Sequence, residues 1–211
     1  MRNFFGGNEG SGGKKGSTSR VPRHSSGWKD LQKHLSTGDS LRVLDIGPTS
    51  STNINYITSL GHSIYMANLV EEALKPEWIS HGGEEEEPRY DVERFLETNL
   101  NFSGRKFDVV LLWDTADFLP AALVEPLFSR LYDVMEPGGR MLAFFHAAAD
   151  PNAPFCRYHL TENETVDVQQ AGTYPVLQIY SNRKIETLLS AFSAFRFFLA
   201  KDSLREVIIT R

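Results

Sequence analysis

Residues 41–61 read LRVLDIGPTSSTNINYITSLG, and this stretch decides the fold. The run 41–46 is mostly apolar, as is typical of a buried strand, and Gly47 and Pro48 end it at once. Apolar residues then recur with helical spacing until Gly61 stops the pattern. A buried strand that passes through a tight turn into a helix predicts an α/β fold.

The rest of the chain repeats this alternation. We predict strands over 62–67, 107–113 and 141–145, and helices over 91–98, over a segment with Pro126 in its first turn, and over 185–192. The last residues, 195–200 and 205–210, predict a hairpin. Alternating strands and helices imply a parallel sheet covered on both faces, with one antiparallel pair at its end.

Composition excludes several classes of protein. The chain has 211 residues, of which 41% are hydrophobic and 23% charged, as expected for one globular domain. No apolar run approaches the roughly 18 residues of a membrane-spanning helix, and the first residues lack the apolar stretch of a secretory signal. The single cysteine, Cys156, cannot form an internal disulfide. We therefore expect a cytoplasmic protein.

Two segments differ from the α/β pattern. Residues 1–27 hold seven glycines and five basic residues against one acid, which predicts a disordered basic tail before a domain over 28–211. The acidic remainder argues against a broad nucleic-acid surface. Residues 147–180 have no strong helical period, and 165–168 and 176–180 predict short paired strands in an insertion that would cover a substrate.

Four stretches in chain order resemble the motifs of class I S-adenosylmethionine-dependent methyltransferases. Residues 43–47 (VLDIG) resemble the first motif, 107–114 (FDVVLLWD) the fourth-strand motif, and 131–145 (LYDVMEPGGRMLAFF) the fifth-strand region, while the terminal hairpin resembles the reversed last strand. The resemblance implies a Rossmann-like seven-stranded sheet, mostly parallel with an antiparallel C-terminal hairpin and helices on both faces. It also implies S-adenosyl-L-methionine as cofactor and a small-molecule methyl acceptor.

The turn after the first strand is the expected cofactor site. Ligands in open α/β sheets sit beyond the carboxyl ends of the strands, and the helix that begins near Ser50 would offer free N–H groups to a carboxylate. The resemblance assigns Asp45, Gly47, Pro48, Thr49 and Ser50 to this site. The family's usual Gly-x-Gly-x-Gly keeps only its first glycine here, so Ser50 has an alternative reading as a plain helix cap.

Three further residues complete the expected cofactor site. Asn68 follows the second strand, where the family often has an acid that binds both ribose hydroxyls, although an ordinary turn-starting Asn is the alternative. Asn99, or Glu97 beside it, is the candidate adenine partner. Trp113 ends the fourth-strand motif and is assigned to the same site.

Chemistry is expected at two strand ends and in the insertion. Asp114 would face the methyl group and the acceptor, and His146 has a pKa suited to proton transfer near neutral pH. Arg157, Tyr158 and His159 are the candidate substrate-binding residues, with packing of Tyr158 as the alternative. The histidines lack carboxylate or thiolate partners at ligand spacing, so no metal site is expected.

Two other functions remain to be weighed against methyl transfer. A dinucleotide-binding enzyme would need the motif Gly-x-Gly-x-x-Gly after the first strand. The residues from Gly47 onward lack two of these three glycines. A non-catalytic relative that keeps the fold and binds a partner is the alternative that the missing glycines and Asn68 favour. Fold by itself does not decide between them.

Overall fold

The structure, a computed structural model, describes residues 19–80, 88–150, 153–198 and 202–211. Most of the expected tail, residues 1–18, lies outside the described residues. Its expected end at residue 27 is wrong, because Val21–His24 forms strand β1 and helix α1 (Ser26–Thr37) begins two residues later. The main-chain bonds of β1 go to a strand some 145 residues further along the chain, so composition alone gave no sign of it.

The centre of the fold is a six-stranded sheet in the order β10-β11-β7-β6-β2-β3. Neighbouring strands are parallel from β3 to β7, whereas β11 runs antiparallel to both β7 and β10. This confirms the mostly parallel sheet with a reversed C-terminal hairpin. The strands are β2 (Arg42–Ile46), β3 (Ser63–Ala67), β6 (Phe107–Trp113), β7 (Met135–His146), β10 (Ala194–Phe198) and β11 (Leu204–Thr210).

The described residues give this sheet six strands rather than the expected seven. The chain between β3 and β6 forms only a separate pair, β4 (Ile79–Ser80) and β5 (Arg89–Tyr90), before helix α4 (Val92–Asn99). The helix predicted over 91–98 is thus confirmed, and it takes the chain that a third strand would need. Asp91 caps it by accepting a hydrogen bond from the Arg94 amide.

A second sheet is built from the insertion and the start of the chain. Strands β8 (Phe155–Leu160) and β9 (Thr165–Gly172) pair antiparallel, and β1 adds to the free edge of β9. The insertion therefore does contain two paired strands, but the expected strand over 176–180 is wrong. Residues 176–180 come after β9 in the chain and form no regular secondary structure.

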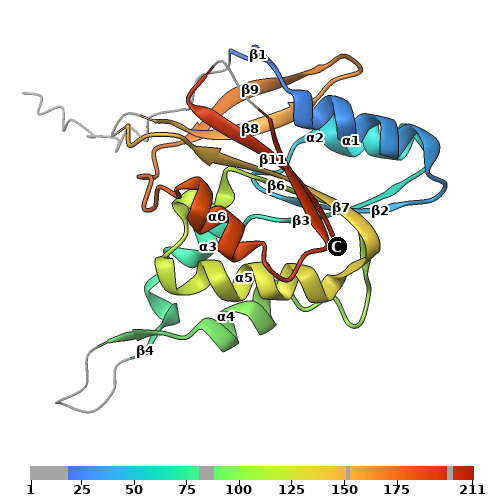
Figure 1. Ribbon diagram of the computed structural model, residues 1–211. Coiled ribbons are helices and arrows are strands. Elements are labelled where there is room, and N and C mark those ends of the chain that lie inside the picture. Colours follow the sequence, from blue (N-terminus) through green and yellow to red (C-terminus); the bar gives the residue numbers. More distant parts are fainter. Residues whose placement is uncertain (1–18, 81–87, 151–152, 199–201) are drawn as a thin grey trace, which may run out of the picture.

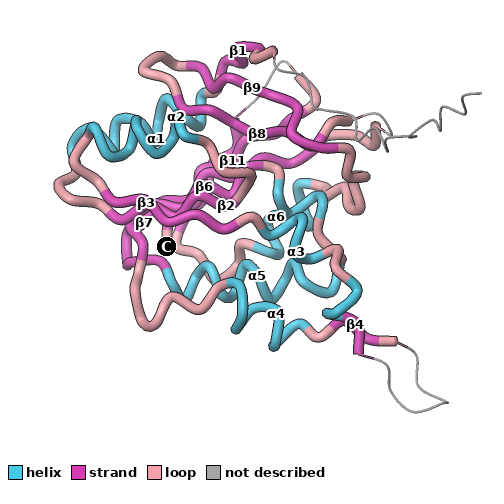
Figure 2. Tube along the Cα trace, turned by 180° about the vertical axis from the view of Figure 1, so that it is seen from behind, coloured by secondary structure: helices cyan, strands magenta, loops and turns pink. Residues whose placement is uncertain are grey.

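Helices cover both faces of the large sheet, as Figures 1 and 2 show. Helices α1 and α2 (Ser51–Ser59) lie on one face together with the small sheet, and α3 (Leu69–Ala73), α4, α5 (Ala121–Val134) and α6 (Asn182–Leu188) lie on the other. Helix α5 begins five residues before Pro126, so the expected N-terminal position of this proline is wrong. No described helix combines the length and the apolar character needed to cross a membrane.

The two faces of the sheet carry two hydrophobic cores. Alternate residues of β6 divide between them: Val110 and Leu112 pack toward α5, and Val109 and Leu111 pack toward α1 and the small sheet. Trp28 of α1 is fully buried in the second core, and its indole Nε1 donates to the carbonyls at the β8–β9 turn. This second core holds the small sheet against the face of the large one.

Candidate active site at the carboxyl edge of the sheet

The parallel strands bring four of the predicted residues to one edge. Gly47 follows β2, Asn68 follows β3, Asp114 follows β6, and His146 ends β7. The Gly47 amide donates to the carbonyl of Ala67 (2.9 Å), which joins the first two strand ends directly. The edge is therefore where the sequence placed the site.

Asp45 is buried at this edge, and both of its carboxylate oxygens are bonded. Oδ1 accepts from the indole Nε1 of Trp113 at 2.7 Å, and Oδ2 accepts from the amide Nδ2 of Asn53 at 2.8 Å. Burial raises the pKa of Asp45 to about 6, and the two hydrogen bonds oppose that rise. Asn53, which the sequence analysis did not single out, is thus part of the site.

Trp113 fills the space beside the glycine turn. Its backbone is left-handed, with φ of 51°, and this conformation is uncommon for a bulky residue. The indole stacks on the ring of Tyr158, with centroids 4.9 Å apart, and a Cβ at Gly47 would lie 3.1 Å from Trp113 Cδ1. The one glycine that the turn keeps is therefore the one that lets the indole approach.

Strand β8 is bonded to the start of α2. The side-chain Nδ2 of Asn53 donates to the Tyr158 carbonyl at 3.1 Å, and Asn53 Oδ1 accepts from the Leu160 backbone amide at 2.8 Å. Ser50 Oγ lies 2.8 Å from His159 Nδ1 and also caps α2, where it accepts from the backbone amide of Asn53. The cap reading of Ser50 is confirmed, and the insertion closes over the turn that precedes it.

Asp114 is completely buried beside the same stack. The Tyr158 hydroxyl donates to its Oδ2 at 2.8 Å. Burial raises the pKa of Asp114 to about 7, against the opposing effects of the Tyr158 hydrogen bond and the nearby His146. A carboxyl group that titrates near neutral pH, at a strand end, is suited to hold or accept a proton.

His146 is fixed by Asp117, a residue that the sequence analysis missed. Asp117 Oδ2 accepts from the His146 amide at 2.6 Å and lies 2.7 Å from its Nδ1. Burial alone would lower the pKa of His146, but the bond to Asp117 and the charges of Asp114 and Asp117 raise it. Asp117 is three residues after Asp114 in a 3₁₀ helix (Thr115–Phe118), and only that spacing hinted at its position.

The remaining predicted residues have fewer described contacts with the glycine turn or with Asp114 and His146. Asn99 is bonded to the Phe95 carbonyl within α4, and no described contact links it to the turn. Thr49 is exposed and Pro48 half-buried on the turn itself. Arg157 extends along the small sheet to Gln169. No group of three or more metal-binding side chains occurs in the described ranges.

Comparison with known proteins finds one matching family. Residues 44–143, just under half of the chain, match the family model described as a methyltransferase domain. This part of the chain is thus similar to methyltransferase domains. The match begins within β2 and ends within β7, so it includes the glycine turn, Asn68, Asp114 and Asp117. No curated protein matches the sequence.

Several solved structures resemble this chain at low identity. The 1,6-didemethyltoxoflavin-N1-methyltransferase of Burkholderia thailandensis is 17% identical, with a TM-score of 0.46 over 87% of this chain and 75% of that one. TehB of Haemophilus influenzae is 11% identical, with a TM-score of 0.47 over 87% and 62%. A SAM-dependent methyltransferase of Methanosarcina mazei is 14% identical, with a TM-score of 0.49 over 85% and 96%.

The two ends of the expected cofactor site differ in how well they fit S-adenosylmethionine. At the ribose end, Asn68 Oδ1 is buried and has no hydrogen-bond partner among the described residues, so it can accept from a hydroxyl. At the methionine end, Trp113 lies against Gly47, and Asp45 is engaged by the protein's own donors. Asn68 is thus suited to a ribose hydroxyl, whereas at the methionine end Trp113 and the bonded Asp45 take the place that the ligand would need.

Proposed function

We propose that this chain is an S-adenosylmethionine-dependent methyltransferase that acts on a small-molecule acceptor. The match to a methyltransferase domain and the convergence of four strand ends support this function. The single observation that carries it is the buried Oδ1 of Asn68, which accepts no hydrogen bond from any described residue and is therefore available to a ligand hydroxyl. It lies at the strand end where the family binds the cofactor ribose.

The chain's own residues have separate roles in this proposal. Asn68 accepts from a ribose hydroxyl, and the N-terminus of α2, with Thr49 exposed before it, faces the carboxylate of the methionine part. The bound cofactor supplies the electrophilic methyl carbon, so the protein contributes mainly orientation. For the methionine part to reach Gly47, the indole of Trp113 has to move off the turn.

The acceptor side of the proposal rests on Asp117 and His146. Asp117 holds Nδ1 of the imidazole, which leaves Nε2 as the nitrogen that takes a proton from the acceptor. Asp114, with a pKa of about 7, accepts the hydrogen bond of the Tyr158 hydroxyl and can take up a proton near neutral pH. Arg157 and His159 belong to the insertion beside this network, where we propose that they line the acceptor path.

Binding of S-adenosylhomocysteine to the full chain tests the proposal. Ligand at about 100 times its dissociation constant adds roughly 2.7 kcal/mol, which shifts the melting temperature of a domain of this size by about 5–10 °C. We expect Asn68→Ala to remove most of this shift and the exposed Asn55→Ala to leave it unchanged. No shift with 1 mM ligand in the wild-type chain would contradict the proposal.

The closed methionine end favours a second candidate function, a non-catalytic relative. If Asp45, Asn53, Trp113 and Tyr158 form a permanent internal network, they replace the cofactor rather than bind it. Trp113→Gly separates the two functions, because glycine suits the left-handed backbone at this position and removes the indole. A variant that remains folded by circular dichroism and binds S-adenosylhomocysteine, when the wild type does not, would establish the second candidate.

A further inference from the structure

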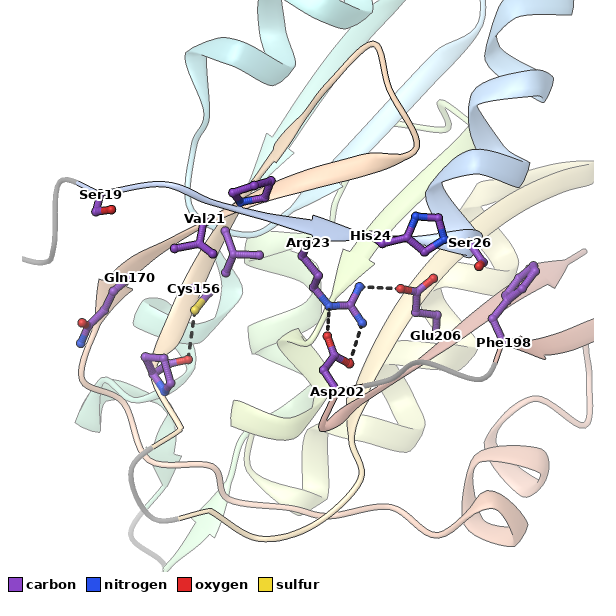
Figure 3. A pocket seen from close by; sticks show the side chains of 13 residues that line it. Ser19, Val21, Arg23, His24, Ser26, Cys156, Gln170, Phe198, Asp202 and Glu206 are labelled. Carbon is purple, nitrogen blue, oxygen red and sulfur yellow. Dashed lines mark hydrogen bonds and ion pairs between the residues drawn. The ribbon is translucent and has the colours of Figure 1, made fainter.

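A cavity of about 920 Å³ lies apart from the glycine turn, between the small sheet and the start of β11. Residues of strands β1, β8 and β9 form one wall, and Phe198 of β10, Asp202 and Glu206 of β11 form the other. Figure 3 shows the side chains that line it. The volume is in the upper part of the range that small-molecule sites occupy, about 300–1,000 Å³.

This cavity does not coincide with the candidate active site. None of its lining residues was predicted as a cofactor, catalytic or substrate residue. The two sites are nevertheless neighbours, since Cys156 in the cavity wall is on the same strand as Tyr158, two positions before it. The Arg23 guanidinium also lies over the ring of Phe144, which packs edge-on against Tyr158.

Apolar side chains form one part of the lining. Val21 and Pro22 of β1 and Val168 of β9 lie on one side, and Phe198 of β10 lies on the other. Val21 is 60% exposed, which is high for a valine that faces a cavity. A ligand with an apolar body would cover it and gain the hydrophobic contribution that is now missing.

The charged side chains of the described lining, Arg23, Asp202 and Glu206, form an ion cluster with one more carboxylate than guanidinium group. Arg23 donates through Nε and Nη2 to Asp202 and through Nη1 to Glu206, so its positive charge faces two carboxylates. Glu206 is buried and fixed, because its Oε2 also accepts from the Ser25 hydroxyl and the Gly27 amide. Asp202 is the accessible member, with 44% of its side chain exposed.

We propose that this cavity binds a small organic cation, an amine attached to an aromatic or short aliphatic body. The ammonium group pairs with Asp202, and the body covers Val21, Val168 and Phe198. An anionic ligand of the same shape is disfavoured, since Arg23 is already neutralised and the surplus carboxylate repels it. The cavity is thus a second site, with a ligand class set by charge and apolar lining.

Calorimetric titration of the full chain with two probes of matched shape tests the charge preference. We expect 2-phenylethylamine to bind at least ten times more tightly than 3-phenylpropionate. Asp202→Asn preserves the shape of the side chain and should weaken amine binding about tenfold, while the exposed Asp39→Asn should not change it. Equal affinity for both probes, or wild-type affinity in Asp202→Asn, would overturn the proposal.

A second variant tests the apolar contact without threatening the fold. Val21→Ala shortens an exposed side chain and should weaken the amine about three- to tenfold. The S-adenosylhomocysteine response gives the independent reference: Asp202→Asn should leave it unchanged. If amine binding were lost in Asn68→Ala instead, the amine would be occupying the active site and the proposed second site would be wrong.

Discussion

Replacing Tyr158 with phenylalanine should destabilise the chain by an amount that depends on pH. The substitution keeps the ring that stacks on Trp113 and removes only the hydroxyl that donates to Asp114 Oδ2 at 2.8 Å. Because Asp114 is buried, the lost donor is not replaced by bulk water. The loss is therefore larger when the carboxyl group is ionised than when it is protonated.

The magnitude follows from the pKa of Asp114, which burial raises to about 7 from its ordinary value of 3.8. A raised carboxyl pKa means that the folded state binds the proton more tightly, so stability falls as the pH rises from about 4 to 7. Without the Tyr158 hydroxyl the pKa rises further. We expect a loss of about 0.5–1.5 kcal/mol at pH 5, with Asp114 protonated, and about 1.5–3 kcal/mol at pH 8.5, with it ionised.

Urea unfolding of both proteins at pH 5 and pH 8.5 measures this difference, and the slope m should not change. Tyr56→Phe is the matched control, because Tyr56 accepts from the uncharged Gln32 amide at 3.0 Å. Its loss should be the same at both pH values. A Tyr158→Phe loss that is equal at the two pH values, or below about 0.5 kcal/mol at pH 8.5, would refute the assigned bond and the burial of Asp114.

Three further substitutions test other contacts. Asp117→Asn should lower the pKa of His146, because the negative charge that opposes the effect of burial is removed. NMR titration of the imidazole measures this pKa, and an unchanged value would contradict the His146–Asp117 pair. Gly139→Ala should cost more than about 2 kcal/mol in urea unfolding, since its Cβ would lie 2.8 Å from the backbone oxygen of Glu136; a loss under 1 kcal/mol would show that the strand can shift. Glu206→Gln should lower the free energy of unfolding by about 1.5–3 kcal/mol with little dependence on salt, because the Arg23–Glu206 ion pair is buried. Urea unfolding measures this loss, and a loss that vanishes in 1 M NaCl would indicate an exposed ion pair.

Much of the fold could be predicted from the sequence because its signals are local. The runs that became β2, β6 and β11 are mostly apolar, and such runs bounded by turn residues are typical of buried strands. Strand β1 carries no such signal. Its sequence is short, exposed and contains Pro22, and it is a strand only because β9 offers an unpaired edge.

The candidate site divides in the same way. Asp45, Gly47 and Asp114 could be predicted, because position at a strand end follows from the strand itself. The contacts among the site residues could not be predicted, since they join distant segments: Ser50 meets His159 across 109 positions, and Trp113 reaches Asp45 across 68. The closure of the methionine end is therefore a tertiary property, and the missing glycines were its only trace in the sequence.

The pairing of β1 with the insertion has a consequence for the order in which the chain can fold. Residues 21–24 leave the ribosome early, but β9 follows only after some 140 further residues, and the partner of Arg23 in β11 is 183 positions away. Contacts this distant in sequence form slowly and late. Until they form, the apolar side of α1 has no core to enter. Strand β1 is thus synthesised before its partners but secured only after them, and dependence on chaperones during synthesis is expected to be concentrated at β1 and α1.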